Sequence, residues 1–168
     1  MANGFTFPVD LTSIMLFASA IGETNKIYYD EEYASKTPLG GVIAPPSFPI
    51  AAAHWNPNYP LRGVRQIPEP PPPDPSSKGS GSIADERGGG EGGLTRLLHG
   101  EQRYTWHKPM RPGMKLSVTG RPGKSWSKEG RRGGTMEFNE TISEFRDESG
   151  ELVCTATSVG IVTGKAVE

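Results

Sequence analysis

The sequence lacks the features that would place the chain in a membrane or in an oxidising compartment. Its single cysteine, Cys154, has no disulfide partner within the chain, which fits a reducing compartment. The longest apolar run, residues 14–18, is far shorter than the roughly 20 residues that cross a bilayer. No lysine or arginine precedes this run, so it is not typical of a secretory signal peptide either. We therefore expect a cytoplasmic protein without a membrane span.

The sequence also lacks the catalytic and ligand-binding motifs that residue spacing alone reveals. It contains no G-x-S-x-G nucleophile elbow and no H-E-x-x-H zinc motif. Residues 123–125 reproduce the end of a phosphate-binding loop, but Val118 stands where that loop needs its first glycine. The three histidines do not have the spacing of metal ligands. We expect no metal site and no bound cofactor.

The charge is balanced overall but unevenly distributed. A net charge of −1 is not typical of a nucleic-acid-binding protein, so we expect no nucleic-acid partner. Residues 103–132, however, contain nine Lys or Arg residues and a single acid, Glu129. Such a window either attracts an anionic partner or is the solvated surface of a hairpin, and both interpretations stay open.

Glycine and proline are in excess, with 22 and 16 residues. Part of the excess is concentrated in residues 67–93, which hold six prolines and seven glycines. Within residues 70–93 the only apolar side chains apart from proline are Ile83 and Ala84, too few to offset the entropy of ordering the segment. We expect one domain over residues 1–168 with a flexible insertion at about residues 63–95.

The chain before the insertion predicts helices. Residues 10–22 have almost no polar face, so this helix is expected to be buried on most sides, and Gly22 is expected in a left-handed C-cap. Shorter helical segments are expected at residues 30–35 and 49–54.

The chain after the insertion predicts strands. They are expected at residues 97–107, 115–120, 135–146 and 151–163, with a basic, glycine-rich connection over residues 120–134. Met136, Phe138 and Ile142 alternate with polar residues, as in a half-buried strand. His99 and His107 would share one face of the first strand only if that strand contains no bulge. The predicted fold class is α+β, an early apolar helix followed by an antiparallel sheet.

Several stretches form a recognisable series along the chain. They are FASAIGETNKIY at residues 17–28, GVIAPPSF at 41–48, LHGEQRYTWHKP at 98–109, and residues 111–113, 128–134 and 147–153. In content and order they resemble the MaoC-like (R)-hydratase/dehydratase family, in the form of its N-terminal FAS1-like dehydratase domain. The resemblance implies a single hot-dog domain, in which an antiparallel sheet wraps around a central apolar helix. It also implies hydro-lyase chemistry of fatty acid metabolism: reversible addition of water to an enoyl thioester.

The family's catalytic motif is altered in this sequence. The motif G-D-x-N-P-[LIV]-H supplies an aspartate and a histidine that share the proton transfers of one water. Here Glu23 stands at the aspartate, Asn25 at the asparagine, Lys26 at the proline and Tyr28 at the histidine. A tyrosine, with an ordinary pKa of about 10, is a poor general base at neutral pH. The resemblance thus assigns Glu23, Asn25 and Tyr28 to a degenerate catalytic site.

A second altered position concerns the substrate carbonyl. In active members a backbone N–H near the start of the next helix polarises the thioester carbonyl. Residues 43–46 read Ile-Ala-Pro-Pro instead of Ile-Ala-His-Gly, which puts Pro46, without an N–H, at the glycine. The substrate-binding residues implied by the resemblance are Ile43, Pro46, Phe48, Arg103, Tyr104 and Trp106. The basic window would attract the phosphates of coenzyme A or of a carrier protein's phosphopantetheine.

Three functions stay open. The first is the non-catalytic, substrate-shaping half of a heterodimeric hydratase or 3-hydroxyacyl dehydratase that acts on acyl-CoA or acyl-carrier-protein thioesters. Since the sequence ends at Glu168, directly after its last strand, we expect the catalytic hot-dog half on a separate subunit. The second is an active homodimeric hydratase that uses Glu23, with Tyr28 orienting the water. The third is an acyl-thioester binding or assembly protein without hydratase chemistry, in which the insertion docks a partner.

Overall fold

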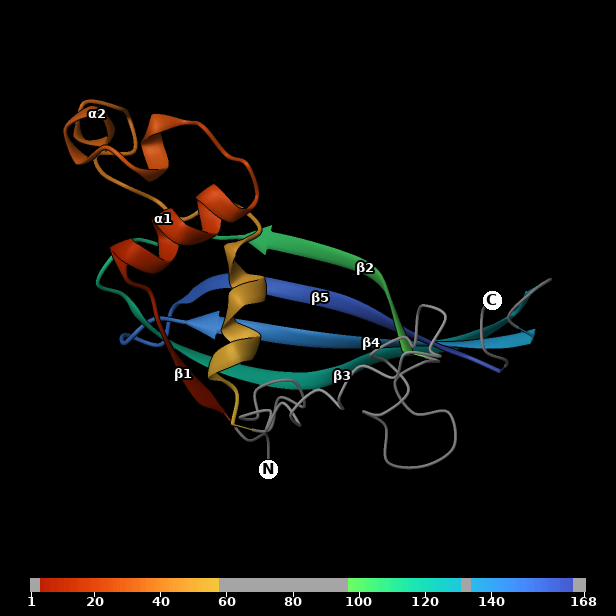
Figure 1. The fold of residues 1–168 in the computed structure, drawn as a ribbon. Helices are drawn as coiled ribbons and strands as arrows, with labels where there is room; N and C mark the ends of the chain where they lie inside the picture. Colours follow the sequence, from red (N-terminus) through yellow and green to blue (C-terminus); the bar gives the residue numbers. More distant parts are fainter. Residues whose placement is uncertain (1–3, 58–96, 131–133, 165–168) are drawn as a thin grey trace, which may run out of the picture.

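The computed structural model describes residues 4–57, 97–130 and 134–164 of the chain. The expected insertion at residues 63–95, and two arginines of the basic window, lie outside the described residues. The elements in chain order are β1 (Phe5–Pro8), α1 (Leu11–Ala20), the 3-10 helix η1 (Lys26–Tyr28), α2 (Glu31–Ser35), the 3-10 helix η2 (Phe48–Trp55), β2 (Leu97–Trp106), β3 (Lys115–Gly130), β4 (Gly134–Arg146) and β5 (Leu152–Thr163) (Figure 1).

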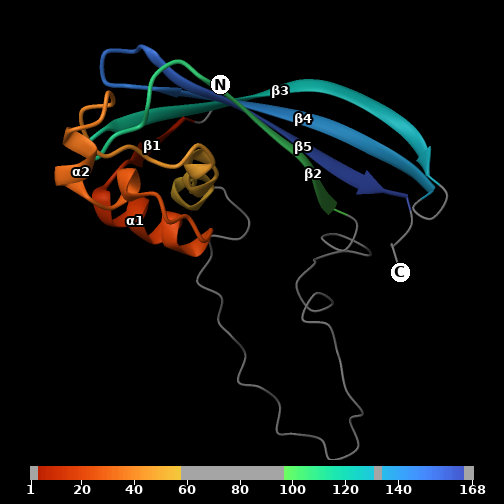
Figure 2. The same cartoon turned by 90° about the horizontal axis from the view of Figure 1, so that it is seen from above.

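The strands form one antiparallel sheet in the order β1-β3-β4-β5-β2. The described helices all lie on one side of this sheet (Figure 2). We call the face on that side the inner face and the opposite face the outer face. Figure 2 shows that these helices cover only one end of the sheet, while β3, β4 and β5 extend well beyond them. The predicted combination of an antiparallel sheet with few helices is confirmed.

The helix α1 has a cap at each end, formed by residue types that are typical of these positions. The Asp10 carboxylate accepts a hydrogen bond from the first turn of the helix. After the last turn, Gly22 adopts a φ of 72°, and its N–H donates to the carbonyl of Ser19 at 3.0 Å. The N–H of Glu23 donates to the carbonyl of Ala18 at 2.9 Å, which completes a Schellman motif. The prediction of a left-handed Gly22 is confirmed.

The burial of α1 differs from the prediction. Ile14 and Ala18 are fully buried, but Leu16 is 66% exposed and Ile21 is 50% exposed. The helix is therefore covered on one side rather than on most sides. The reason is that another helix, η2, occupies the position across the inner face of the sheet.

The 3-10 helix η2 crosses the inner face of the sheet, as the yellow segment in Figure 1 shows. Its first residue, Phe48, is 1% exposed. The Phe48 ring lies 5.4 Å from the ring of Phe7 in β1 and 5.4 Å from that of Phe17 in α1, measured between centroids. The core is thus centred where β1, α1 and η2 meet, and η2 rather than α1 is the helix that the sheet wraps around.

Two strand predictions also need correction. The strand β1 was missed, because four residues are too short to give a clear periodic pattern. The segment expected as a glycine-rich connection, residues 120–134, instead continues β3 as far as Gly130. The pairing with β4 is irregular between Pro122 and Ser125. A proline is tolerated at such an irregularity, because a ladder hydrogen bond is missing there anyway.

The two faces of β4 differ in a way that bears on the site. The predicted alternation is present, but Met136, Phe138 and Ile142 point to the outer face. There the Phe138 ring stacks on Trp126 of β3, with 5.1 Å between centroids and 9° between the planes. On the inner face only Phe145, at the covered end of the strand, is a buried aromatic residue. Most of the inner face of β4 is therefore polar.

Candidate functional site

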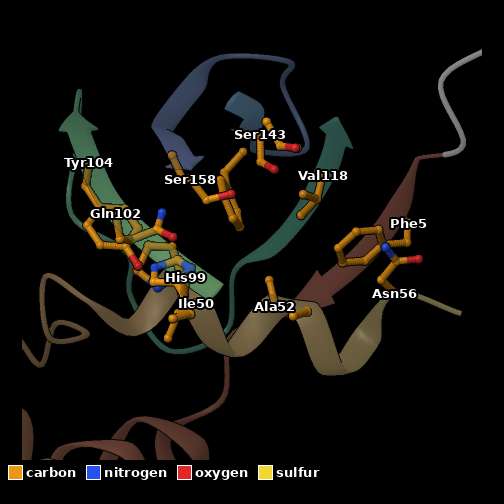
Figure 3. Close-up of a pocket in the computed structure, with 15 residues that line it drawn as sticks. Phe5, Ile50, Ala52, Asn56, His99, Gln102, Tyr104, Val118, Ser143 and Ser158 are labelled. Carbon is orange, nitrogen blue, oxygen red and sulfur yellow. The ribbon is translucent and has the colours of Figure 1, made fainter. Parts of the chain in front are cut away.

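A pocket of about 480 Å³ lies between η2 and the inner face of the sheet (Figure 3). We call it the sheet pocket. Part of its lining is apolar and comes from Phe5, Ile50, Ala52, Val118, Phe145 and Ala156. Another part is polar and comes from Asn56, His99, Gln102, Thr141, Ser143 and Ser158. A concave site of this size with a mixed lining suits a small organic ligand.

The position of His99 depends on a bulge in β2. The pairing of β2 with β5 shifts between His99 and Glu101, so His99 joins the inner face together with Gln102. A glycine at position 100 makes this geometry accessible, because a β-carbon there would lie 2.6 Å from Cδ1 of Ile161. Sequence reasoning missed His99 and Gln102 as lining residues. The signal that could have found them is Gly100 inside a strand pattern.

Tyr104 is the one predicted substrate-binding residue that lines the sheet pocket. Its hydroxyl donates to the carbonyl of Ser47, at 3.4 Å, and so links β2 to the start of η2. Burial raises the pKa of Tyr104 to about 12, with a smaller contribution from Cys154. The phenol is therefore neutral at physiological pH and acts only as a hydrogen-bonding group.

Three other predicted residues, Ile43, Pro46 and Trp106, line a smaller pocket of about 290 Å³, which we call the proline pocket. His107 and Lys108 also contribute to its lining. This pocket lies where the chain enters η2, and its wall consists mostly of apolar groups.

Phe48 and Arg103 do not reach either pocket. Phe48 is part of the core described above. Arg103 follows Gln102 in β2 and therefore points to the outer face, where it pairs with Glu101 at 3.1 Å and with Glu140 at 2.6 Å. The structure thus separates Arg103 from its sequence neighbours Gln102 and Tyr104.

Several cations of the basic window are paired with acids. Lys108 bridges the carboxylates of Asp147 and Glu151, at 2.5 and 2.6 Å, in the turn between β4 and β5. The Lys108 ammonium lowers the pKa of Asp147 to about 2, helped by the hydroxyl of Ser149. At this corner the charges are therefore balanced locally rather than presented to an anionic partner.

The predicted catalytic-motif positions lie on the loop that leads from α1 through η1. One carboxylate oxygen of Glu23, Oε1, accepts hydrogen bonds from the N–H groups of Thr24 and Asn25, at 3.0 and 3.1 Å. The Asn25 side chain caps η1 by accepting from the N–H of Ile27 at 3.0 Å. Glu23 and Asn25 are thus engaged by their own loop. Neither residue lines the sheet pocket or the proline pocket.

Tyr28 and Pro46 occupy the other two altered positions. Tyr28 is 8% exposed, and burial, with a smaller contribution from the charge of Glu23, raises the pKa of its hydroxyl. A phenol with a raised pKa can donate a hydrogen bond at neutral pH but cannot act as a base. Next to Pro46, the N–H of Phe48 at the start of η2 already donates to the carbonyl of Pro45 at 2.9 Å.

The described residues contain no cluster of three or more His, Cys, Asp or Glu side chains that could hold a metal ion. Among the helices that the structure describes, none is both long and apolar enough to cross a membrane.

Comparison with known proteins identifies the family. The model of the FAS1-like dehydratase domain region matches residues 1–156. The chain belongs to this family. A curated relative from Thermomonospora curvata, named as a probable enoyl-CoA hydratase alpha subunit, is 30% identical over 149 residues, which are 88% of this chain. This FAS1-like dehydratase domain spans only 43% of the length of that relative.

Solved structures of MaoC-like dehydratases share the fold. The domain matches the ChsH1-ChsH2 complex from Mycobacterium tuberculosis with a TM-score of 0.64 and 18% identity, covering 99% of this chain and 85% of that chain. It matches the HadBC 3R-hydroxyacyl-ACP dehydratase complex from the same organism with a TM-score of 0.62 and 18% identity, covering 95% of each chain. The expected single hot-dog fold is therefore confirmed, as is the relationship to MaoC-like hydratases and dehydratases.

The family assignment gives the altered positions a chemical meaning. The catalytic motif expected from the resemblance supplies a carboxylate and a base close to one water, together with an N–H donor for the carbonyl. In this domain the carboxylate of Glu23 is held by its own loop, and Tyr28 is a buried neutral phenol. Pro46, at the position where the resemblance predicts the donor, has no N–H. What the domain does offer is a pocket on the inner face of the sheet.

Proposed function

We propose that this chain is the substrate-shaping half of an (R)-specific enoyl-thioester hydratase or 3-hydroxyacyl-thioester dehydratase. In this proposal a second hot-dog subunit carries the catalytic aspartate and histidine. The two subunits form a cytoplasmic heteromer that acts on an acyl-CoA or acyl-carrier-protein thioester of fatty acid metabolism. The sheet pocket receives the acyl chain.

The observation that carries this proposal is the position of Glu23. Its Oε1 atom accepts two N–H groups of its own loop, and it does not line either pocket. A carboxylate held in this way is poorly placed to take a proton from a water that lies against a substrate. The altered residues Tyr28 and Pro46 also support this proposal.

The shortness of η2 supports the role given to the sheet pocket. This helix has only 8 residues, from Phe48 to Trp55. Beyond it, the inner face of the described strands contributes residues such as Thr141 and Ser158 to the lining of the pocket. An acyl chain that enters from a partner's active site would find room there without displacing a core side chain.

The likeness to two-protein complexes supports a heteromer. The ChsH1-ChsH2 and HadBC structures are complexes of two proteins, and the relative from Thermomonospora curvata is named as an alpha subunit. A domain with an altered catalytic motif fits such an arrangement, because its partner supplies the missing groups.

The experiment is reconstitution with a MaoC-type subunit that contains an intact G-D-x-N-P-x-H motif. We expect no hydration of crotonyl-CoA by this chain alone and clear hydration by the complex. Full activity of the isolated chain would refute the proposal and favour the homodimeric hydratase. Stable binding of the partner without any turnover would favour an assembly protein.

A pocket variant tests the role of the sheet pocket in the same complex. Ala156 is 7% exposed and lines the pocket, so Ala156→Leu should raise KM for a long-chain enoyl-CoA and leave crotonyl-CoA unaffected. The matched control is Thr157→Leu, on the neighbouring residue that points to the outer face. Equal effects of the two variants would mean that the pocket does not receive the chain.

A further inference from the structure

The inner face of the sheet changes character along the strands. The pairing register places residues of neighbouring strands side by side in rows that run across the sheet. The row under the core consists of Val118, Phe145, Cys154 and Trp106 and is apolar throughout. The next row, Gly120, Ser143, Ala156 and Tyr104, is mixed.

The two rows beyond these are polar. One consists of Pro122, Thr141, Ser158 and Gln102, and the following one of Ser125, Asn139, Gly160 and His99. The sheet pocket covers parts of all four rows, because its lining runs from Phe145 to His99. A ligand that lies along the strands would therefore contact hydrocarbon at one end and hydrogen-bonding groups at the other.

Three polar side chains of the pocket are available to a ligand. Gln102, Ser143 and Ser158 are neither fully buried nor fully exposed, and their side chains point into the space between the sheet and η2 (Figure 3). Within the part of the chain that the structure describes, no hydrogen bond to another side chain or to the backbone engages them. Nothing in the described protein therefore has to be broken when they bind a ligand.

A plain hydrocarbon chain would fit these rows poorly. It would displace water from the hydroxyl and amide groups without replacing the lost hydrogen bonds, and burying unpaired polar groups is unfavourable. A strand face built for hydrocarbon would carry Val, Ile or Leu at half-buried positions such as 143 and 158. The polar residues at these central positions indicate a ligand with its own hydrogen-bonding atoms.

We propose that the sheet pocket selects acyl chains that carry an oxygen function, a hydroxyl or a carbonyl, on the part of the chain away from the apolar row. This inference rests on the proposed function, since it takes the ligand to be an acyl thioester. The groups that recognise the oxygen are the hydroxyls of Thr141, Ser143 and Ser158 and the amide of Gln102. The apolar row around Phe145 packs against the unsubstituted part of the chain.

The test compares saturated ligands that the enzyme cannot turn over. The probes are octanoyl-CoA and a set of hydroxyoctanoyl-CoA thioesters with the hydroxyl at successive positions beyond the middle of the chain. Their affinities are measured by calorimetry with the full chain, alone and in complex with the catalytic subunit. Because a neutral hydrogen bond contributes roughly 2- to 10-fold in affinity, at least one hydroxylated ligand should bind about 5- to 10-fold more tightly than octanoyl-CoA.

A variant in which the polar residues of the pocket lining are replaced by apolar ones should lose the preference for hydroxylated ligands. The triple variant Thr141→Val, Ser143→Ala, Ser158→Ala removes three hydroxyls with little change in volume. It should lose the preference for the hydroxylated ligand and bind octanoyl-CoA more tightly than the wild type does. Thr157→Val is the matched control, because it removes a hydroxyl of β5 that points to the outer face, and its affinities should equal those of the wild type.

Each outcome decides the inference separately from the proposed function. The inference would be overturned if octanoyl-CoA binds as tightly as every hydroxylated ligand, or if no probe binds. Either result would mean that the polar rows are simply a solvent-facing part of the sheet. If the complex still hydrates crotonyl-CoA in that case, the proposed function stands. If a hydroxylated ligand is preferred but the complex shows no turnover, the inference stands and the proposed function fails.

Discussion

Replacing Gly100 with alanine should destabilise the domain, because the bulge in β2 leaves no room for a side chain. A β-carbon at this position would lie 2.6 Å from Cδ1 of Ile161, 2.9 Å from its Cγ1 and 3.3 Å from the carbonyl oxygen of Val159. The Ile161 side chain can turn partly away, but the backbone carbonyl of Val159 is held in the sheet. We expect a loss of about 1–3 kcal/mol in the free energy of unfolding, the usual cost of overpacking.

Urea unfolding, followed by circular dichroism, measures this loss. Gly120→Ala is the matched control, since it is also a strand glycine but a β-carbon there meets nothing within 4 Å. It should be neutral or stabilise by up to about 1 kcal/mol, because alanine lowers the entropy of the unfolded chain. A Gly100→Ala variant as stable as Gly120→Ala would refute the steric argument.

A double variant checks the cause of the loss. Ile161→Ala removes both side-chain atoms that a β-carbon at position 100 would approach most closely. If the clash with Ile161 dominates, Gly100→Ala should cost less in that background, with a coupling of at least about 0.5 kcal/mol. Strict additivity of the two substitutions would instead indicate that the carbonyl of Val159, or a change of register, sets the cost.

Three further predictions concern the environment of single residues. The Lys108 ammonium holds the pKa of Asp147 at about 2, below its usual 3.8, so this carboxylate stabilises the fold above pH 3.8 and loses that effect as the pH falls toward 2. Lys108→Met should flatten the acid part of the profile of urea midpoints against pH, and an unchanged profile would contradict the pairing. Cys154 is 0% exposed, and burial raises its pKa to about 12. Iodoacetamide should therefore modify it only after unfolding, which mass spectrometry measures. Rapid labelling of the native protein would contradict this burial. Gly22→Ala should lower the free energy of unfolding in urea by about 1–2 kcal/mol, because φ of Gly22 is 72° while a β-carbon would meet nothing within 4 Å. Gly22→Asn should lower it less, because asparagine adopts a positive φ more readily than alanine. Equal losses would argue against a conformational cause.

The sequence predicted those elements whose ends carry a chemical signal. The start of α1 at Asp10 and its end at Gly22 follow from capping chemistry that acts within a few residues. The turn between β4 and β5 is of the same kind, because the side chain of Asp147 accepts N–H groups of Ser149 and Glu151. Local hydrogen bonds of this kind do not depend on the rest of the fold.

The elements that the sequence missed depend on distant partners. The strand β1 exists because it pairs with Leu116 and Val118 of β3, which follow more than 100 residues later. Likewise, β3 continues past Pro122 because β4 offers an uninterrupted partner on the other side of the irregularity. Nothing within either segment encodes that pairing, so propensity alone ends or omits the strand.

Only part of the candidate site could be predicted from the sequence, because the face to which a strand residue points depends on how the strand pairs with its neighbours. Of the six predicted substrate-binding residues, Tyr104 lines the sheet pocket, Ile43, Pro46 and Trp106 line the proline pocket, and Phe48 and Arg103 line neither. His99 was missed because a bulge changes the face to which it points, and strand alternation beyond a bulge cannot be read without knowing that the bulge exists. The same alternation, applied to Arg103, places it on the outer face.

The central claim is that this domain shapes a substrate site without performing the chemistry. The most direct measurement is kcat/KM for crotonyl-CoA of the reconstituted complex in which this chain carries Glu23→Gln and Tyr28→Phe together. We predict a value within about twofold of the wild-type complex, while a substitution of the partner's motif aspartate abolishes turnover. A loss of roughly 100-fold or more from the double variant, the usual consequence of removing a general acid or base, would contradict the account.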